Sequence, residues 1–323
     1  MSKKNTVMTS GGVEVRQKPL KLRIWNNRGY YLMFLPVLLF VLIIYYWPML
    51  GVRYAFYEYK PVGTPKFIGF ENFVKMFGTN RKAFLTSFVN TLELSIVRLL
   101  ITNLSAIIVS IFLNEMKNLF AKKTLQTIIY LPHFMSWAVV ASIFSLFLSP
   151  SSTGMVNGIL RDLGILGEAD KSIYFLAESE WWRPIFYMIN IWKETGWGTI
   201  IFLATLSGIN PELYEAADID GATRMQKIFY VTLPALTNTI ITVLILNLAK
   251  VLNMFEPVFV LYNNAVYDVA DVISTYTYRQ TFAIALPNYG YSTAVGLFRS
   301  LVACVLMLAS NWASKKLRGR GII

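Results

Sequence analysis

Hydrophobic residues in this chain are grouped into long uninterrupted segments that alternate with shorter polar ones. The first such segment, Gly29 to Val52, contains no charged residue and closes with Tyr45-Tyr46-Trp47-Pro48. A helix needs about 20 apolar residues to cross a bilayer, and aromatic side chains favour the two interfaces. The segment is also longer than the apolar core of a secretory signal peptide. The pattern therefore predicts a membrane span.

Five further segments have the same character. The predicted spans lie at about residues 30–50, 88–113, 126–148, 184–207, 235–260 and 290–312. We therefore expect an all-α polytopic membrane protein with a transmembrane domain at 30–312, between basic tails at 1–29 and 313–323. Six spans place both termini on one side. Because Lys and Arg are denser on the side that holds the tails, we expect both termini to be cytoplasmic.

Composition narrows the function classes. Of the 323 residues, 55% are apolar and 15% are charged, whereas soluble domains carry about 25% charged residues. This excludes a soluble enzyme, a disordered chain and a disulfide scaffold. One cysteine (Cys304) and one histidine (His133) exclude a Cys/His metal cluster and any catalytic set with two imidazoles. The net charge of +12 is interpreted as a signal of orientation in the lipid membrane, with no nucleic acid as partner.

The segment 208–234, between the fourth and fifth predicted spans, is several times longer than the usual connection of about 4–6 residues. Pro211 suits the first position of a helix. Gly221 can adopt the left-handed conformation that ends one. We therefore expect a cytoplasmic helix–glycine–helix loop. Its small residues Ala216 and Ala217 allow another surface to approach closely.

This loop resembles the EAA loop of ATP-binding-cassette (ABC) importer permeases. The residues that carry the likeness, and that it assigns to coupling with an ATPase, are Glu215, Ala216, Ala217, Asp220, Gly221, Leu233 and Pro234. Other motifs are similar to the carbohydrate-type permeases, in the branch that includes importers of complex oligosaccharides and polysaccharides such as alginate. They include Tyr130-Leu131-Pro132-His133-Phe134, Trp192-Lys193-Glu194 and Ser274-Thr275-Tyr276. Asn263-Asn264-Ala265-Val266 departs from the Gly-Gly-Gly-Pro turn of many sugar permeases.

The resemblance implies a non-catalytic permease subunit in a bacterial cytoplasmic (inner) membrane. A homologous second permease would complete the pore as a heterodimer. Two cytoplasmic ABC ATPase subunits would supply power, and an extracytoplasmic solute-binding protein would deliver the oligosaccharide. The chain contains no Gly-x-x-x-x-Gly-Lys-Ser/Thr loop. We therefore expect no cofactor in this chain, with ATP and Mg bound by the partner ATPase.

Polar residues inside the predicted spans are candidates for the translocation path. A charge there costs about 2.5–3.5 kcal/mol unless it has a partner or a water-filled cavity. The candidates are Lys193, Glu194, Asn247, Lys250, Asn253 and Glu256. The alternative is that these groups hold helices together. Gly196 and Gly198 predict a local break beside the Lys193-Glu194 pair. Glu93 and Arg98 point in different directions on one helix, so each is expected to find a partner on another helix.

Two rival functions stay open at this point. An ion-coupled secondary transporter with its site at Lys250 and Glu256 would need no ATPase. A polytopic membrane enzyme would need convergent acid–base or metal groups, which a single His, a single Cys and dispersed carboxylates do not provide. The aromatic-rich segment 261–288 has two interpretations: a lipid-interface belt, or a surface for an external partner or for stacked sugar rings.

Overall fold

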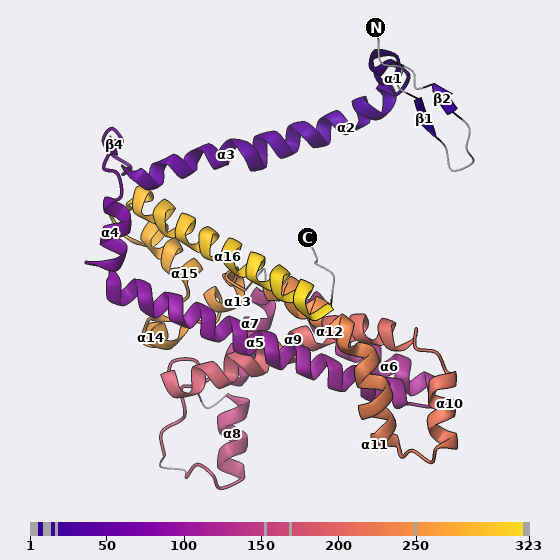
Figure 1. Ribbon diagram of the computed structural model, residues 1–323. Helices are drawn as coiled ribbons and strands as arrows, with labels where there is room; N and C mark the ends of the chain where they lie inside the picture. Colours follow the sequence, from indigo (N-terminus) through magenta and orange to yellow (C-terminus); the bar gives the residue numbers. More distant parts are fainter. Residues whose placement is uncertain are drawn as a thin grey trace. The chain divides into compact units, whose positions relative to one another are not determined.

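The computed structural model describes residues 6–8, 14–16, 19–151, 154–167, 170–248 and 251–318. The chain divides into two units, residues 1–53 and 54–323, and each is described by itself. Helices dominate both units (Figure 1). This confirms the predicted all-α class in its main feature. Two short antiparallel strand pairs, β1–β2 and β3–β4, are additions that the hydrophobic pattern does not predict.

The first unit begins with β1 (Thr6–Met8) and β2 (Glu14–Arg16), followed by α1 (Leu20–Asn26) and α2 (Arg28–Val41). A π-helical turn (Leu42–Tyr46), α3 (Trp47–Met49) and a 3₁₀ segment (Leu50–Phe56) continue the same helical run. Pro48 has no N–H to donate to the carbonyl four residues earlier, and the wider π turn lies at that point. The first predicted span is thus a helical run from Arg28 to Phe56.

The second unit is mostly helical, with one hairpin at its start. Its elements are β3 (Tyr57–Glu58), β4 (Lys66–Phe67), α4 (Glu71–Phe77), α5 (Arg81–Glu115), α6 (Leu119–Tyr130), α7 (Trp137–Phe147), α8 (Met155–Asp162), α9 (Ser179–Leu206), α10 (Glu212–Ile219), α11 (Arg224–Lys227), α12 (Leu233–Leu248), α13 (Glu256–Phe259), α14 (Tyr267–Ala270), α15 (Ile273–Tyr278) and α16 (Tyr289–Arg318). Figure 1 shows α10 and α11 near one end of α5, and α4, α14 and α15 toward the other. We call these the α10 end and the α4 end.

The core of the second unit follows α5. Phe84 of this helix belongs to a buried cluster with residues of α15 and α16. Leu94 belongs to a second cluster with residues of α7, α9 and the segment 251–272. Ala106 joins a third cluster with residues of α9 and α12. Helix α5 therefore passes through all three clusters, and α9 contributes to two of them.

The third predicted span, 126–148, is broken, so its prediction as one continuous helix is wrong. Helices α6 and α7 are separated by a 3₁₀ turn at Leu131–Phe134, and their axes differ by 101°. Pro132 lies in this turn, where its missing N–H interrupts the helical hydrogen bonds. Ser136 then starts α7, because its Oγ accepts a hydrogen bond from the Val139 amide at 3.3 Å.

The expected break at Gly196 and Gly198 is also wrong, because α9 runs through both residues. Their small size serves packing. A Cβ atom on Gly196 would lie 2.3 Å from the Ile129 carbonyl oxygen of α6. One on Gly198 would lie 2.7 Å from the Cβ of Ala106 in α5. These two glycines therefore let α9 approach its neighbours more closely than any other residue type allows.

The fifth predicted span, 235–260, is displaced toward the N-terminus. The helical run extends from Arg224 to Leu248, and α13 is a separate short helix. Pro257 explains the new start, since proline suits the first turn of a helix and cannot donate to a preceding one. Consequently Asn253 and Glu256 do not share a helix with Asn247. Lys250, the remaining member of that predicted stripe, lies outside the described residues.

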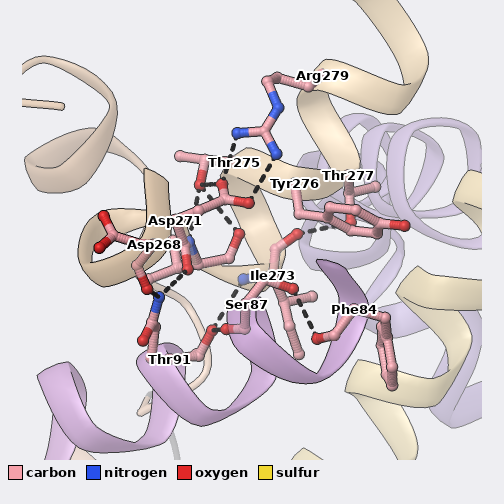
Figure 2. Close-up of polar contacts among 12 residues, drawn as sticks. Phe84, Ser87, Thr91, Asp268, Asp271, Ile273, Thr275, Tyr276, Thr277 and Arg279 are labelled. Carbon is pink, nitrogen blue, oxygen red and sulfur yellow. Dashed lines mark hydrogen bonds and ion pairs between the residues drawn. The ribbon is translucent and has the colours of Figure 1, made fainter. Parts of the chain in front are cut away.

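At the α4 end, a polar network joins α5 to the segment around α15 (Figure 2). The Ile273 amide donates to Thr91 Oγ1 at 2.8 Å. The buried carboxylate of Asp271 accepts from Arg279 at 2.9 and 2.7 Å and from Thr275 Oγ1 at 2.8 Å. Burial raises the pKa of the Asp271 carboxyl group, while the hydrogen bonds from Arg279 and Thr275 act in the opposite direction.

Four helical runs of the described chain are long and apolar enough to cross a membrane: Arg28–Phe56, Arg81–Glu115, Arg224–Leu248 and Tyr289–Lys316. The bent α6–α7 pair makes a fifth candidate. Helix α9 has the necessary length but is more polar. The chain is therefore a multi-pass membrane protein. Helix α16 also continues to Arg318, six residues beyond the predicted end of the sixth span.

Replacing Gly196 with alanine tests the close contact between α9 and α6. Because the added methyl group meets backbone atoms, we expect Gly196→Ala to destabilise the protein by about 1–3 kcal/mol. Gly158→Ala is a matched control, since nothing lies within 4 Å of its added Cβ and it is inside helix α8. The control should keep or slightly raise the thermal unfolding midpoint in detergent. Equal midpoints for both variants would contradict the packing role.

Removing Arg279 should produce a pH-dependent loss of stability. Arg279→Met leaves the Asp271 carboxylate, 6% exposed, without its cation, and we expect a cost of about 3 kcal/mol at neutral pH. Burial then favours the protonated acid in the folded state. The deficit should therefore shrink as pH falls through the raised pKa of Asp271. Thermal unfolding at pH 7 and pH 5 measures this difference. The double variant with Asp271→Asn should recover stability at pH 7, and a pH-independent deficit would refute the argument.

Candidate coupling loop and translocation cavity

The candidate coupling loop, residues 208–234, is a helical hairpin closed by a glycine. Gly221 has a φ of +74°, as predicted for a left-handed helix end. Its amide donates to the Asp218 carbonyl at 3.1 Å, and the Ala222 amide donates to the Ala217 carbonyl at 2.9 Å. These paired bonds complete the end of α10. Thr223 then begins α11 through a reciprocal cap with Gln226.

The hairpin is braced internally at two places. Lys227 pairs with Asp218 at 2.7 Å, and the Tyr214 hydroxyl hydrogen-bonds to Thr232 at 3.0 Å. A π-helical turn, Ile228–Thr232, joins α11 to α12. Pro234 stands in the first turn of α12, where its missing N–H leaves the carbonyl four residues earlier without its helical partner. The loop is thus continuous with a helix that packs against α5, α9 and α16.

The remaining surface of the hairpin is exposed and rich in apolar groups. Ile219 is 88% exposed and Tyr230 is 79% exposed. Leu213, Met225 and Phe229 are also exposed. The predicted coupling residues Glu215, Ala216, Asp220, Gly221 and Pro234 are exposed, whereas Ala217 and Leu233 are half-buried. Exposed apolar groups gathered on one short element are typical of a surface that contacts lipid or another protein.

A cavity of about 400 Å³ lies between α5, α9 and α12. We call it the path cavity. Its polar lining comprises Ser95, Arg98, Thr102 and Asn103 from α5, Glu194 from α9 and Asn247 from α12. Trp197 and several aliphatic side chains form the rest of the wall. This mixture of hydrogen-bonding groups and apolar surface is typical of a site for a small polar ligand.

Two charged groups of opposite sign line the path cavity. Arg98 Nη1 donates to Asn190 Oδ1 at 3.4 Å, and within the described chain no carboxylate forms an ion pair with it. Glu194 Oε2 lies 3.2 Å from Nδ1 of His133, whose ring stacks on Trp197 with centroids 5.0 Å apart. Arg98 therefore keeps donors for a ligand, whereas Glu194 is partly engaged by the imidazole.

Lys193 is turned away from the path cavity. Its Nζ donates to the carbonyl oxygens of His133 at 2.9 Å and Met135 at 2.8 Å, and it lies 5.3 Å from the centre of the Trp137 ring. The residue is 4% exposed. These carbonyl groups belong to the break between α6 and α7. Lys193 thus supplies the hydrogen bonds that the bent backbone lacks.

The structure divides the six path candidates among separate places. Glu194 and Asn247 meet in the path cavity. Asn253 lines a different cavity near α15. Glu256 is exposed at the start of α13. Lys250 lies outside the described residues.

Arg98 is a cavity residue that the sequence analysis did not place in the path. It was expected to pair with another helix, and Asn190 of α9 is that partner. Glu93 likewise pairs with Arg183 of α9, which confirms the expectation of partners on a different helix. The sequence did contain a signal for Arg98: it lies in an apolar helix and has no acidic residue three or four positions away to pair with. Such an arginine must find its partner outside its own helix.

Comparison with known proteins identifies the family to which this chain belongs. Residues 106–319 match the family described as binding-protein-dependent transport system inner membrane component. The chain belongs to this family. It is 36% identical to the polygalacturonan/rhamnogalacturonan transport system permease protein YteP of Bacillus subtilis, over 95% of this permease and 94% of YteP.

Two crystal structures are also similar to the permease. One is a bacterial ABC transporter involved in the import of the acidic polysaccharide alginate, with 40% identity, a TM-score of 0.84, and coverage of 93% of this chain and 100% of the other. The second is a bacterial alginate ABC transporter in complex with an alginate pentasaccharide-bound periplasmic protein, with 39% identity, a TM-score of 0.84, and coverage of 94% and 100%. These likenesses identify the permease as an ABC importer subunit. They decide against the ion-coupled transporter.

Adjacent residues Lys193 and Glu194 should respond differently to substitution. We expect Lys193→Met to lower the free energy of unfolding by about 1–3 kcal/mol, because it leaves buried carbonyl groups unpaired. Glu194→Gln should keep the unfolding midpoint of the wild type, because the amide can still hydrogen-bond to His133. It should change substrate uptake, because it removes a negative charge from the cavity wall. Thermal unfolding and uptake in reconstituted vesicles measure the two effects. The reverse pattern would exchange the roles of these residues.

Proposed function

We propose that the permease forms half of the translocation pore of an ATP-driven importer of acidic oligosaccharides or polysaccharides. The observation that carries the substrate class is the path cavity, whose wall holds Glu194 and also Arg98, a guanidinium group that forms no direct ion pair in the described chain. Arginine binds carboxylates through two parallel hydrogen bonds. The alginate transporter and YteP, whose names specify acidic polymers, support the same class. We place the permease in a bacterial cytoplasmic membrane, as the family description supports.

The proposed topology has six spans with both termini in the cytoplasm. Helix α9 supplies the additional span beside the four apolar helices and the α6–α7 pair. Its polar groups do not oppose this, because Lys193 is buried against backbone carbonyls and Glu194 faces a cavity. In this arrangement the α10 end is cytoplasmic, and the α4 end faces the binding protein.

The proposed coupling surface is the α10–α11 hairpin, with Glu215, Ala216, Ala217, Asp220 and Gly221 at its tip and Leu233 and Pro234 at its base. An ATPase subunit would cover the exposed apolar groups of the hairpin. Nucleotide-driven movement would then reach α12 through the continuous helix and the Tyr214–Thr232 hydrogen bond. ATP and Mg would be bound by the ATPase, so this chain itself would hold no cofactor.

The complete importer would contain a second, homologous permease, two ATPase subunits and an extracytoplasmic solute-binding protein. The periplasmic protein in complex with the alginate transporter supports the last of these partners. Within the described chain, the path cavity is lined by the helices α5, α9 and α12 and by Val251. A second permease would supply the other wall of the pore.

Substitutions in the hairpin test the coupling assignment. Gly221→Leu strains a backbone with positive φ, and Glu215→Lys reverses an exposed charge. We expect each to lower co-purification of the ATPase about tenfold, equivalent to about 1.4 kcal/mol of binding free energy. ATP-dependent uptake of alginate pentasaccharide by reconstituted vesicles should fall in parallel.

Gly164→Leu is the matched control. Gly164 also has a positive φ (+70°) and open space around its Cβ position, but it lies in a loop after α8. It should impose similar local strain and leave ATPase binding unchanged. If all three variants retain the ATPase and transport at the wild-type rate, the hairpin is not the coupling surface.

A further inference from the structure

A second cavity, of about 390 Å³, lies among α15, α16 and the segment that precedes α13. It shares no lining residue with the path cavity. Its wall includes the aromatic rings of Phe255, Tyr278 and Phe282 and the guanidinium group of Arg299. We call it the aromatic cavity.

Arg299 is the cation of this cavity, and it lies within an apolar helix. Its Nη1 donates to Ser274 Oγ at 2.9 Å. No carboxylate in the described chain forms an ion pair with it, and the buried carboxylate of Asp271 is engaged by Arg279. A guanidinium group has five N–H donors, and Ser274 accepts from one nitrogen of Arg299, which also lines the cavity. An arginine inside a membrane helix requires such a partner or water.

The aromatic rings form a connected wall. The centroids of Phe255 and Tyr278 are 5.4 Å apart, and those of Tyr278 and Phe282 are 5.2 Å apart. Phe282 is 71% exposed. The negative face of an aromatic ring attracts the polarised C–H groups on one face of a pyranose. A connected wall of rings thus suits successive sugar residues of a chain.

Small polar groups complete the cavity. Thr277 and Thr281 donate their hydroxyl protons to carbonyl groups of their own helical segment, which leaves their oxygens as acceptors. Asn253 adds an amide with both donors and an acceptor. The volume falls within the range of about 300–1,000 Å³ that ligand pockets occupy. Aromatic faces, hydroxyl acceptors and one cation together match a sugar that carries a carboxylate.

We propose that the aromatic cavity is a second sugar subsite that binds a uronate residue of the transported chain. The carboxylate binds Arg299, which Ser274 holds in position, and the pyranose face lies against the rings of Phe255, Tyr278 and Phe282. This inference rests on the proposed function, because it assumes that the substrate is acidic. Two cavities with an arginine each would hold two separate uronate residues of one oligosaccharide.

A different occupant of Arg299 is a carboxylate of the second permease. Such a pair would neutralise the arginine and make it a residue of the assembly interface. The aromatic wall favours the sugar, because a protein carboxylate needs no platform of rings beside it. The experiment below separates the two.

Binding to the assembled importer in detergent, without its binding protein, tests the subsite. Equilibrium dialysis is done with radiolabelled alginate pentasaccharide and with its carboxyl-reduced, uncharged form. The wild type should bind the acidic form at least about tenfold more tightly than the reduced form. Arg299→Met should reduce that ratio by about tenfold, and Arg299→Lys by a smaller factor, because lysine keeps the charge and loses the planar fork. Phe282→Ala should weaken both forms equally.

Arg81→Met serves as the control, since Arg81 is an exposed arginine in the first turn of α5, outside both cavities. It should leave the ratio unchanged. An unchanged ratio in Arg299→Met would overturn the subsite, and so would loss of the second permease on purification of that variant. Failure of the wild type to import the acidic pentasaccharide in reconstituted vesicles would instead refute the proposed function.

Discussion

The arrangement of the second unit depends on the hydrogen bonds that the ammonium group of Lys193 makes to the broken backbone between α6 and α7. A sharp bend in an apolar environment leaves carbonyl groups without partners, and each one costs free energy. Lys193 satisfies them from α9. The same contact places His133 beside Glu194 and Trp197, so it also fixes one wall of the path cavity. The break between α6 and α7, the buried charge of Lys193 and the wall of the path cavity therefore depend on one another.

Hydrophobic runs predict where the membrane helices lie but not how they bend. The first, second and sixth predicted spans appear as long helices at nearly the expected positions, because each run is apolar enough to determine the outcome alone. The fourth appears as α9, which is long but more polar. The third span could not be predicted as broken: Pro132 permits a bend, but only the partner on α9 makes it stable. The helical run of the fifth span begins at Arg224, before the predicted residue 235, because residues 224–233 contain no glycine or proline that would end it. Pro257 then lies in the first turn of the separate helix α13. Pro257 was a visible signal, whereas the role of Gly196 in close packing depends on a neighbour distant in sequence.

The candidate sites show the same division between local and distant causes. The positive φ of Gly221 could be predicted from the residue type, because glycine adopts the left-handed conformation at a helix end without steric cost. A residue's position on a helix does not reveal which helix it faces. Of the predicted path residues, Glu194 and Asn247 line the path cavity, whereas Lys193 and Asn253 lie elsewhere. Lys193 and Glu194 are adjacent and point to different surroundings. Arg98 and Arg299 both lie within apolar helices, and the structure places them in separate cavities with different walls.

Helix α5 extends about 52 Å at 1.5 Å per residue, well beyond the hydrocarbon thickness of about 30 Å. It contains neither glycine nor proline, so it has no point of easy flexure. Because it packs into all three buried clusters, it acts as a stiff lever across the whole unit. If one end of α5 tilts, the other end must tilt with it. Any bending must therefore occur in the short connections at residues 78–80 and 116–118.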